Sequence, residues 1–195
     1  MLSHFPAWSV GEGVSVLFPD RCTRLLRRAR RGDREAFRAL YAELHAKVYA
    51  FAARRTRARE DAEDITARVF QALLESLADI DEERGVLPWT LAVARNLLID
   101  AARAQRPVAP ESELAAALVE PRTPLGDLLV QESLAQIDAL PAADRELIAL
   151  RYADGLRHKE IARLLGIGEA AVRQRLSRAL RGLRRAQEGE LAHDP

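Results

Sequence analysis

Cysteine and aromatic residues are scarce in this chain of 195 residues. The one cysteine, Cys22, cannot form a disulfide within the chain, and no second cysteine stands at a metal-ligand spacing. The sequence therefore favours a reducing compartment, the cytoplasm, and we expect neither a metal site nor a cofactor. Aromatic residues make up only 5%, whereas alanine, leucine and arginine dominate and lose little rotamer freedom in a helix. We therefore predict an all-α fold.

Long hydrophobic runs and catalytic motifs are also missing. No apolar run approaches the roughly 20 residues that span a bilayer, so we expect no membrane insertion. The four histidines are scattered, and none belongs to a His-Glu-x-x-His run. Glu63 and Asp64 are adjacent, so on a helix their side chains would point about 100° apart and could not easily share a proton. We predict that the chain is not an enzyme and has no catalytic residues.

The formal net charge of +1 conceals a strong segregation of charge along the chain. Between Pro107 and Leu140 the only base is Arg122, against six acids. From Arg173 to Arg185 there are six arginines and no acid. Like charges crowded on one helix repel one another, so this basic helix indicates a polyanionic partner.

The placement of proline, glycine and apolar residues divides the chain into five segments. We predict an irregular leader at 1–22, a helical domain at 23–105, an acidic linker at 106–127, a second helical domain at 128–187 and a tail at 188–195. The linker holds four prolines, which is typical of a connection between domains. A short helical patch is expected within it, around 114–119.

The first domain shows apolar residues at the three- and four-residue spacings of helices. Asp33 is a plausible N-cap for a helix that begins near Arg34. A second helix is expected at about 60–78, with an acidic first turn that suits the helix dipole, and Pro88 is well placed to start a third. The apolar residues expected to face inward include Leu26, Phe37, Leu40, Tyr41, Leu44, Val48, Phe51, Ile65, Val69, Phe70, Leu73, Leu74, Leu77, Leu91, Val93 and Leu98.

Residues 157–185 predict a helix-turn-helix. A short helix at 157–165 ends at Gly166, which can take the left-handed conformation of a helix stop, and a second helix follows at once. In such a motif the outward N-terminal side chains of the second helix meet base edges in the major groove. The residues expected to read bases are Arg173, Gln174, Ser177 and Arg178, and those expected to bind phosphate are Lys159, Arg175 and Arg181. The alternative is a solvated helix face, although such faces usually mix both signs of charge.

Several segments together match a known bacterial pattern. They are Gly32–Tyr41, Asp61–Ile65, Trp89–Asp100, and Leu140–Glu146 followed by Arg157–Arg185. In this order they resemble the extracytoplasmic-function (ECF) sigma factors, the smallest type of the sigma-70 family. The resemblance implies a sigma factor that binds core RNA polymerase and promoter DNA. Its two small helical domains would be joined by a flexible linker, with sigma region 2 at 23–105 and sigma region 4 at 128–187.

The resemblance also assigns roles within the predicted region 2. The clamp helices of the largest polymerase subunit would bind the helix that begins at the acidic turn, through Asp61, Glu63, Asp64 and Phe70. The acidic turn also has a simpler explanation, because carboxylates stabilise any helix N-terminus. Whether an anti-sigma factor binds the chain is left open.

A second set of roles concerns the opening of the −10 element. By resemblance, Asn96 would line a pocket for a flipped base, with Arg95 and Arg103 near the DNA backbone and Trp89 as a wedge. Trp89 has core packing as an equal alternative. Region 4 would then read the −35 element through its helix-turn-helix.

The main rival function is a stand-alone helix-turn-helix regulator that binds DNA without polymerase. Residues 24–104 would then form a sensing or dimerising domain, which the scarcity of aromatic residues makes less attractive. Such a regulator usually binds two half-sites as a dimer, whereas a sigma factor reads DNA poorly without core polymerase.

Overall fold

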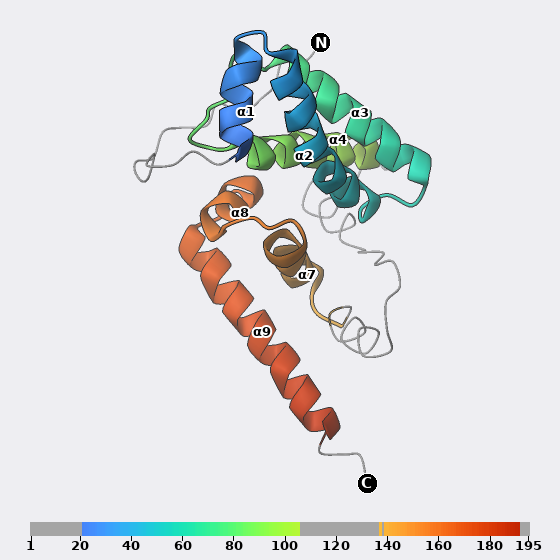
Figure 1. Ribbon diagram of the computed structural model, residues 1–195. Helices are drawn as coiled ribbons and strands as arrows, with labels where there is room; N and C mark the ends of the chain where they lie inside the picture. The colour runs from blue at the N-terminus through green and yellow to red at the C-terminus, as the bar shows by residue number, and fades with distance from the viewer. Residues whose placement is uncertain (1–20, 106–136, 138, 192–195) are drawn as a thin grey trace.

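The computed structural model describes residues 21–105, 137 and 139–191, and all of the regular structure within them is helical. This confirms the all-α fold predicted from composition. Residues 1–20 of the predicted leader, the linker with its helical patch and the end of the tail lie outside the described residues, whereas residues 21 and 22 of the leader belong to the first helix. In order, the elements are α1 (Arg21–Arg30), α2 (Arg34–Ala53), α3 (Arg59–Glu75), α4 (Val86–Gln105), α7 (Ala142–Ile148), the π-helix η1 (Ala149–Ala153), α8 (His158–Leu165) and α9 (Glu169–Leu191) (Figure 1).

The helices α1 to α4 pack together as one unit, with α2 in contact with each of the other three. Asp33 caps α2 as predicted, because its Oδ1 accepts a hydrogen bond from the backbone N–H of Ala36 at 2.9 Å. The Arg28 side chain lies 2.8 Å from the other carboxylate oxygen of Asp33. Fully buried side chains at the centre of the unit include Leu26, Leu40, Leu44, Val48, Phe51, Leu73 and Leu91.

Two of the apolar residues predicted to face inward lie on the surface instead. The exposed fraction is 40% for Tyr41 and 57% for Leu74. Both sit at the margin of an apolar stripe, where a one-dimensional spacing cannot tell the edge of the face from its centre. Helix α3 also ends at Glu75, short of the predicted 78, and α4 begins at Val86, two residues before Pro88.

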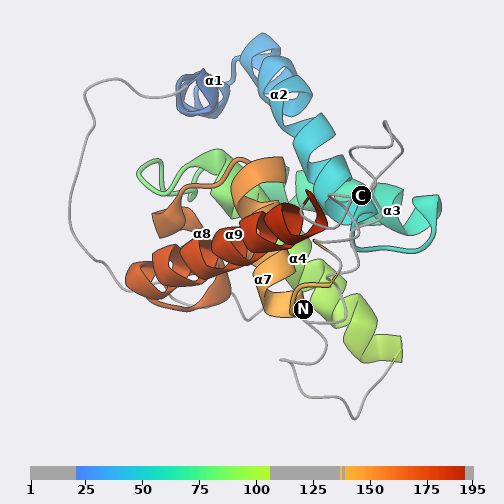
Figure 2. The ribbon, with the colours of Figure 1, turned by 90° about the horizontal axis from the view of Figure 1, so that it is seen from below.

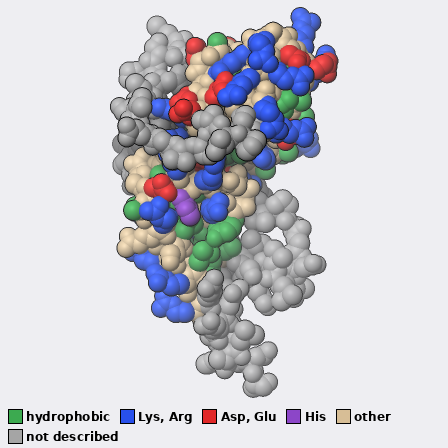
Figure 3. All heavy atoms as spheres, turned by 60° about the vertical axis from the view of Figure 1, so that its left-hand side comes forward, with side chains coloured by type: hydrophobic (Ala, Val, Ile, Leu, Met, Phe, Trp, Pro, Cys, Tyr) green, Lys and Arg blue, Asp and Glu red, His purple; other side chains and the backbone are tan. Residues whose placement is uncertain are grey.

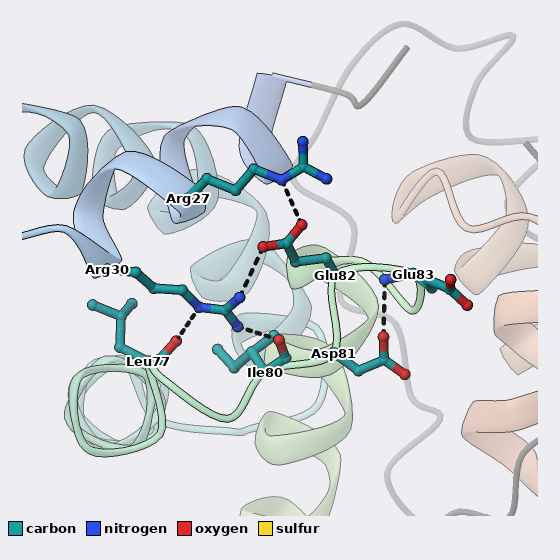
Figure 4. Close-up of polar contacts among 7 residues, drawn as sticks. All are labelled: Arg27, Arg30, Leu77, Ile80, Asp81, Glu82 and Glu83. Carbon is teal, nitrogen blue, oxygen red and sulfur yellow. Dashed lines mark hydrogen bonds and ion pairs between the residues drawn. The ribbon is translucent and has the colours of Figure 1, made fainter. Parts of the chain in front are cut away.

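Helix α1 is fixed to the loop between α3 and α4 by two arginines. Glu82 accepts hydrogen bonds from Arg27 Nε at 2.5 Å and from Arg30 Nη1 at 2.8 Å. Arg30 also donates from Nε to the carbonyl oxygen of Leu77, at 2.7 Å, and from Nη2 to that of Ile80 (Figure 4). The two side chains therefore tie this loop, which is built of turns, to α1.

The C-terminal unit contains the predicted helix-turn-helix. Gly166 ends α8 with φ 67°, in the left-handed region, and the N–H of Ile167 donates to the carbonyl oxygen of Ala162 at 3.0 Å. At the start of α8, the Glu160 carboxylate accepts a hydrogen bond from the backbone N–H of Arg157 at 2.6 Å. The side chains that join α7, α8 and α9 at their inner faces include Leu147, Leu150, Leu156, Ile161, Val172, Leu176 and Ala179.

The two units touch one another, since α8 packs against α4 (Figure 1). Seen from below, α8 and α9 lie in front of α4 (Figure 2). The buried apolar side chains of the described residues form one cluster that includes members from each unit. The C-terminal unit is therefore seated on the N-terminal one.

Candidate nucleic-acid interface

Helix α9 presents a basic outer face and an apolar inner face. Val172, Leu176 and Ala179 are buried, as the spacing predicted, and Leu183 is half-buried. This anchoring turns the opposite side of the helix to solvent. All of the residues predicted to bind the −35 element are exposed, namely Lys159, Arg173, Gln174, Arg175, Ser177, Arg178 and Arg181.

The charge on this face is almost entirely positive. Arg173 Nη1 lies 2.7 Å from a carboxylate oxygen of Glu169, one turn earlier on the exposed first turn of α9. The arginines further along the helix follow without an acid among them. Basic side chains are seen on the lower part of the molecule, where α9 lies (Figure 3). A one-sign face of this kind attracts a polyanion and supplies the bidentate donors that read guanine.

On α4, the predicted −10 residues lie in different surroundings. Asn96 is exposed, and so is Arg103, whose Nη1 lies 3.3 Å from the Asp100 carboxylate on the same helix. Trp89 is half-buried and packs against the hydrophobic core. Trp89 therefore packs as its alternative interpretation predicted, while Asn96 and Arg103 lie on the surface.

Arg95 is not placed as the sequence analysis expected. Its side chain is only 16% exposed and faces the C-terminal unit, where its Nε lies 3.8 Å from a carboxylate oxygen of Glu146 on α7. In this arrangement of the two units the Arg95 side chain is covered, so the predicted place near the DNA backbone requires the C-terminal unit to move away. This pairing could not be predicted from the sequence, because the two residues are far apart along the chain.

The residues predicted to bind polymerase fall into two groups. Asp61, Glu63 and Asp64 are exposed at the start of α3, and Glu63 accepts a hydrogen bond from Arg59 Nε at 2.7 Å. This bond raises the pKa of Arg59. Phe70 is only 5% exposed, and its ring centroid lies 4.3 Å from that of Tyr41. Phe70 therefore packs against the partly exposed ring of Tyr41 and is not itself open to a partner.

A cluster of buried charges lies between the units and was not predicted from the sequence. Asp154, which follows η1, forms a hydrogen-bonded ion pair with Arg54 at the end of α2, and its other oxygen lies 3.8 Å from Arg55 Nη2. Burial raises the pKa of Asp154 and of Glu146, and the neighbouring arginines partly oppose this shift. Burial also lowers the pKa of Arg55 to about 10. Composition and periodicity cannot find such a site, because its members come from different elements.

The described residues show neither a membrane-spanning helix nor a metal-binding group. None of their helices is long and apolar enough to cross a membrane. Among the same residues, no group of His, Cys, Asp and Glu side chains is placed to hold a metal ion.

An exposed basic recognition helix on an all-α scaffold defines a helix-turn-helix protein of two helical units. Comparison with known proteins places it more closely. The family model for sigma-70 region 2 matches residues 40–108, and that for sigma-70 region 4 matches residues 131–183. The chain belongs to the ECF sigma factors of the sigma-70 family.

Similar proteins support this placement. A probable RNA polymerase sigma factor, RfaY from Xanthomonas campestris pv. campestris, is 34% identical over 76% of this chain, which covers only 39% of that protein. The ECF RNA polymerase sigma factor SigK from Mycobacterium ulcerans is 29% identical, with 85% of this chain and 92% of the relative covered. SigK from Mycolicibacterium vanbaalenii is 30% identical, with 83% and 86% covered.

Two solved structures share the fold. CnrH, in complex with the cytosolic domain of CnrY, matches with a TM-score of 0.59 at 23% identity, covering 87% of this chain and 99% of that one. RpoE from Bartonella quintana, in complex with the anti-sigma factor NepR, matches with a TM-score of 0.58 at 19% identity, covering 78% and 96%. At these identities the likeness concerns the fold alone.

Proposed function

We propose that this chain binds core RNA polymerase and directs it to promoters, reading the −35 element with α9 and opening the −10 element with α4. The observation that carries the proposal is the exposed arginine face of α9, held outward by the buried residues Val172, Leu176 and Ala179. The chain itself makes no phosphodiester bond in this proposal, since the polymerase supplies the chemistry. Its place is then the cytoplasm, where polymerase and chromosome are found.

The recognition step depends on donors near the start of α9. Arg173 and Arg178 can each bind O6 and N7 of a guanine, and Gln174 can bind N6 and N7 of an adenine. Arg175, Arg181 and Lys159 bind phosphates, which fixes the register of the helix in the groove but carries no sequence information. Ser177 lies between the two readers and can bond to either kind of base edge.

The opening step belongs to α4. Separating bases costs stacking and pairing energy, which capture of a flipped base in a protein pocket offsets. Asn96 is exposed and carries an amide that can bond a base edge. Arg103, also exposed, contacts the backbone, and Arg95 joins it when the C-terminal unit is displaced. Trp89 acts here by holding α4 on the core.

Polymerase binding is assigned to the exposed start of α3. Asp61, Glu63 and Asp64 contact the clamp helices of the largest subunit, while Phe70, further along α3, packs against Tyr41. We divide the chain accordingly into region 2 at 23–105, an acidic linker at 106–127 and region 4 at 128–187. CnrH and the Bartonella RpoE are each bound to another protein in their solved structures. We extend this to an anti-sigma partner for the present chain.

Run-off transcription with purified core RNA polymerase tests the proposal. Polymerase alone and polymerase with this protein are compared on a pool of promoter fragments. We expect specific transcripts only with the protein, and their loss with Arg173→Ala or Arg178→Ala. Arg31→Ala is the matched control, because it removes one exposed positive charge from the turn after α1 and leaves α9 intact. A footprint by the protein alone, with no transcript and no binding to core, would favour the stand-alone regulator.

A further inference from the structure

Five charged side chains meet where the C-terminal unit covers the N-terminal one. Arg54 and Arg55 come from the end of α2 and Arg95 from α4, while Glu146 and Asp154 come from the C-terminal unit. Their side chains are between 2% and 18% exposed, so water reaches none of them freely. Among the described residues, the cluster holds three cations and two anions, an excess of one positive charge. An excess of buried arginine is costly unless an anion balances it.

The N-terminal half of this cluster is held in place without help from the C-terminal unit. The Arg55 guanidinium lies over the ring of Phe51, with Cζ 3.7 Å from the centroid, and its Nη1 donates to the Phe51 carbonyl oxygen at 3.0 Å. These contacts lie within one helix and its end. They fix the orientation of a planar donor group that binds carboxylate and phosphate in the same bidentate way. The three arginines, which we call the arginine site, are therefore suited to phosphate as well as to the two carboxylates.

The observed contact between the units is incompatible with promoter binding by both. The names of the two elements put their centres about 25 base pairs apart, which is roughly 85 Å of duplex at 3.4 Å per base pair. Helix α9 has 23 residues and spans only about 35 Å. With α8 packed on α4, the recognition helix and Asn96 cannot reach both elements at once. The C-terminal unit must leave the N-terminal one before both elements are bound.

We propose that Glu146 and Asp154 hold this sigma factor in a closed resting form, in which they cover an arginine site that binds DNA phosphate once the C-terminal unit has moved away. The two carboxylates occupy the positions that phosphate oxygens take in the open form. Opening therefore exchanges one pair of anions for another, and the arginines are not left unpaired. The proposal rests on the proposed function, because the competing anion is promoter DNA.

The physical cost of the closed form makes it reversible. Burial raises the pKa of Asp154 and of Glu146, because it disfavours their charged forms. The ion pairs that these carboxylates form with the arginines therefore stabilise the closed form only weakly. Within the part of the chain that the structure describes, Arg95 Nε and one oxygen of Asp154 also have no hydrogen-bond partner. A polyanion that pairs with the same arginines in a more solvent-exposed site can displace the carboxylates.

Fluorescence energy transfer on the full chain tests closure directly. Dyes are attached at Ala46→Cys on α2 and Ala143→Cys on α7, both exposed positions, in a Cys22→Ser background. The opened variant is Glu146→Gln with Asp154→Asn, which keeps the side-chain shapes and leaves three buried arginines unpaired. The matched control is Glu35→Gln with Glu43→Gln, which removes the same charge from α2. We expect high transfer in the wild type and the control, and a marked loss in the opened variant.

Binding to a random-sequence 20-mer of single-stranded DNA tests the masking. We expect the opened variant to bind at least about fivefold more tightly than the control, the lower end of the range typical of coupled sites. The gain should vanish when Arg54→Gln and Arg95→Gln are added. Circular dichroism shows whether the opened variant is folded. If it unfolds, the variant with Arg54→Gln and Arg95→Gln replaces it, since it removes the arginine partners of the two carboxylates. We expect this variant also to show lower energy transfer than the wild type.

The outcomes separate this proposal from the function on which it rests. Unchanged energy transfer in both sets of variants overturns the closed form, and so does opening without tighter DNA binding than the control. Loss of transfer together with tighter binding supports it. Run-off transcription with the wild-type chain and core polymerase judges the sigma function independently of either result.

Discussion

Arg54 and Asp154 form a hydrogen-bonded ion pair across a separation of one hundred residues in the sequence. The Asp154 side chain is 2% exposed and that of Arg54 is 18% exposed. The pair joins the end of α2 to the residue that follows η1, a few positions before the helix-turn-helix. It therefore ties the position of sigma region 4 to that of sigma region 2.

A double-mutant cycle on this pair should give strongly non-additive effects. We expect Arg54→Gln and Asp154→Asn each to lower the free energy of urea unfolding, and the double variant to lose less than the sum, with an interaction of about 0.5–3 kcal/mol. Each single change leaves a buried charge without its partner, which the double change avoids. The cycle on Arg38 and Glu35, an exposed pair on α2, should give a smaller interaction. Equal interactions in the two cycles would show that burial of the Arg54 pair has no energetic consequence.

Two arginines of α9 should differ in how their loss affects DNA binding. Arg173→Ala removes a predicted base reader, so we expect a loss of about 1–3 kcal/mol that depends on the base pair opposite. Arg181→Ala removes a predicted phosphate contact, so binding should weaken alike on all sequences, and the slope of log affinity against log salt should fall by about 1. Competition among promoter variants at several salt concentrations, with holoenzyme, measures both. Identical sequence profiles for the two variants would contradict the division of roles.

The structural features that were predicted correctly depend on residues close together in the sequence. The N-cap Asp33, the helix stop at Gly166 and the inner face of α9 rest on residues a few positions apart, and all three were predicted correctly. The resemblance to ECF sigma factors is carried by several such local segments in order. The family comparisons confirmed it.

What could not be predicted depends on contacts between distant elements. Tyr41 and Leu74 were expected inside because spacing defines a stripe but not its edges. Arg95 was expected near the DNA backbone, and nothing near it in sequence shows that Glu146 lies opposite. Arg54 and Arg55 were not singled out at all, because a pair of arginines at a helix end is usually solvated. Only the arrangement of the two units brings these residues together with Asp154.

The left-handed turn between α8 and α9 should depend on Gly166 and not on Gly168. Gly166 has φ 67°, which costs a residue with a Cβ about 1 kcal/mol, and an added Cβ would meet nothing within 4 Å, so the cost is purely conformational. We expect Gly166→Ala to lower the free energy of unfolding by that amount, measured in urea. Gly168→Ala is the control, since its backbone lies outside that region and its Cβ would also be unobstructed. Equal effects at the two positions would contradict the assignment.

The last prediction concerns the acid stability of region 2. The hydrogen bond from the Ala36 N–H, followed by that from Arg28, lowers the pKa of Asp33 from its ordinary value of 3.8. A carboxylate whose pKa is lower in the folded state stabilises the fold fully above the unfolded value and loses this contribution as the pH falls through the folded value. Asp33→Asn keeps an oxygen to cap α2 but carries no charge. We therefore expect the wild type to be the more stable near neutral pH and the difference in melting temperature to shrink below pH 3.8. A difference that is constant across this range would show that the cap acts through its hydrogen bond alone and that the charge of Asp33 contributes nothing.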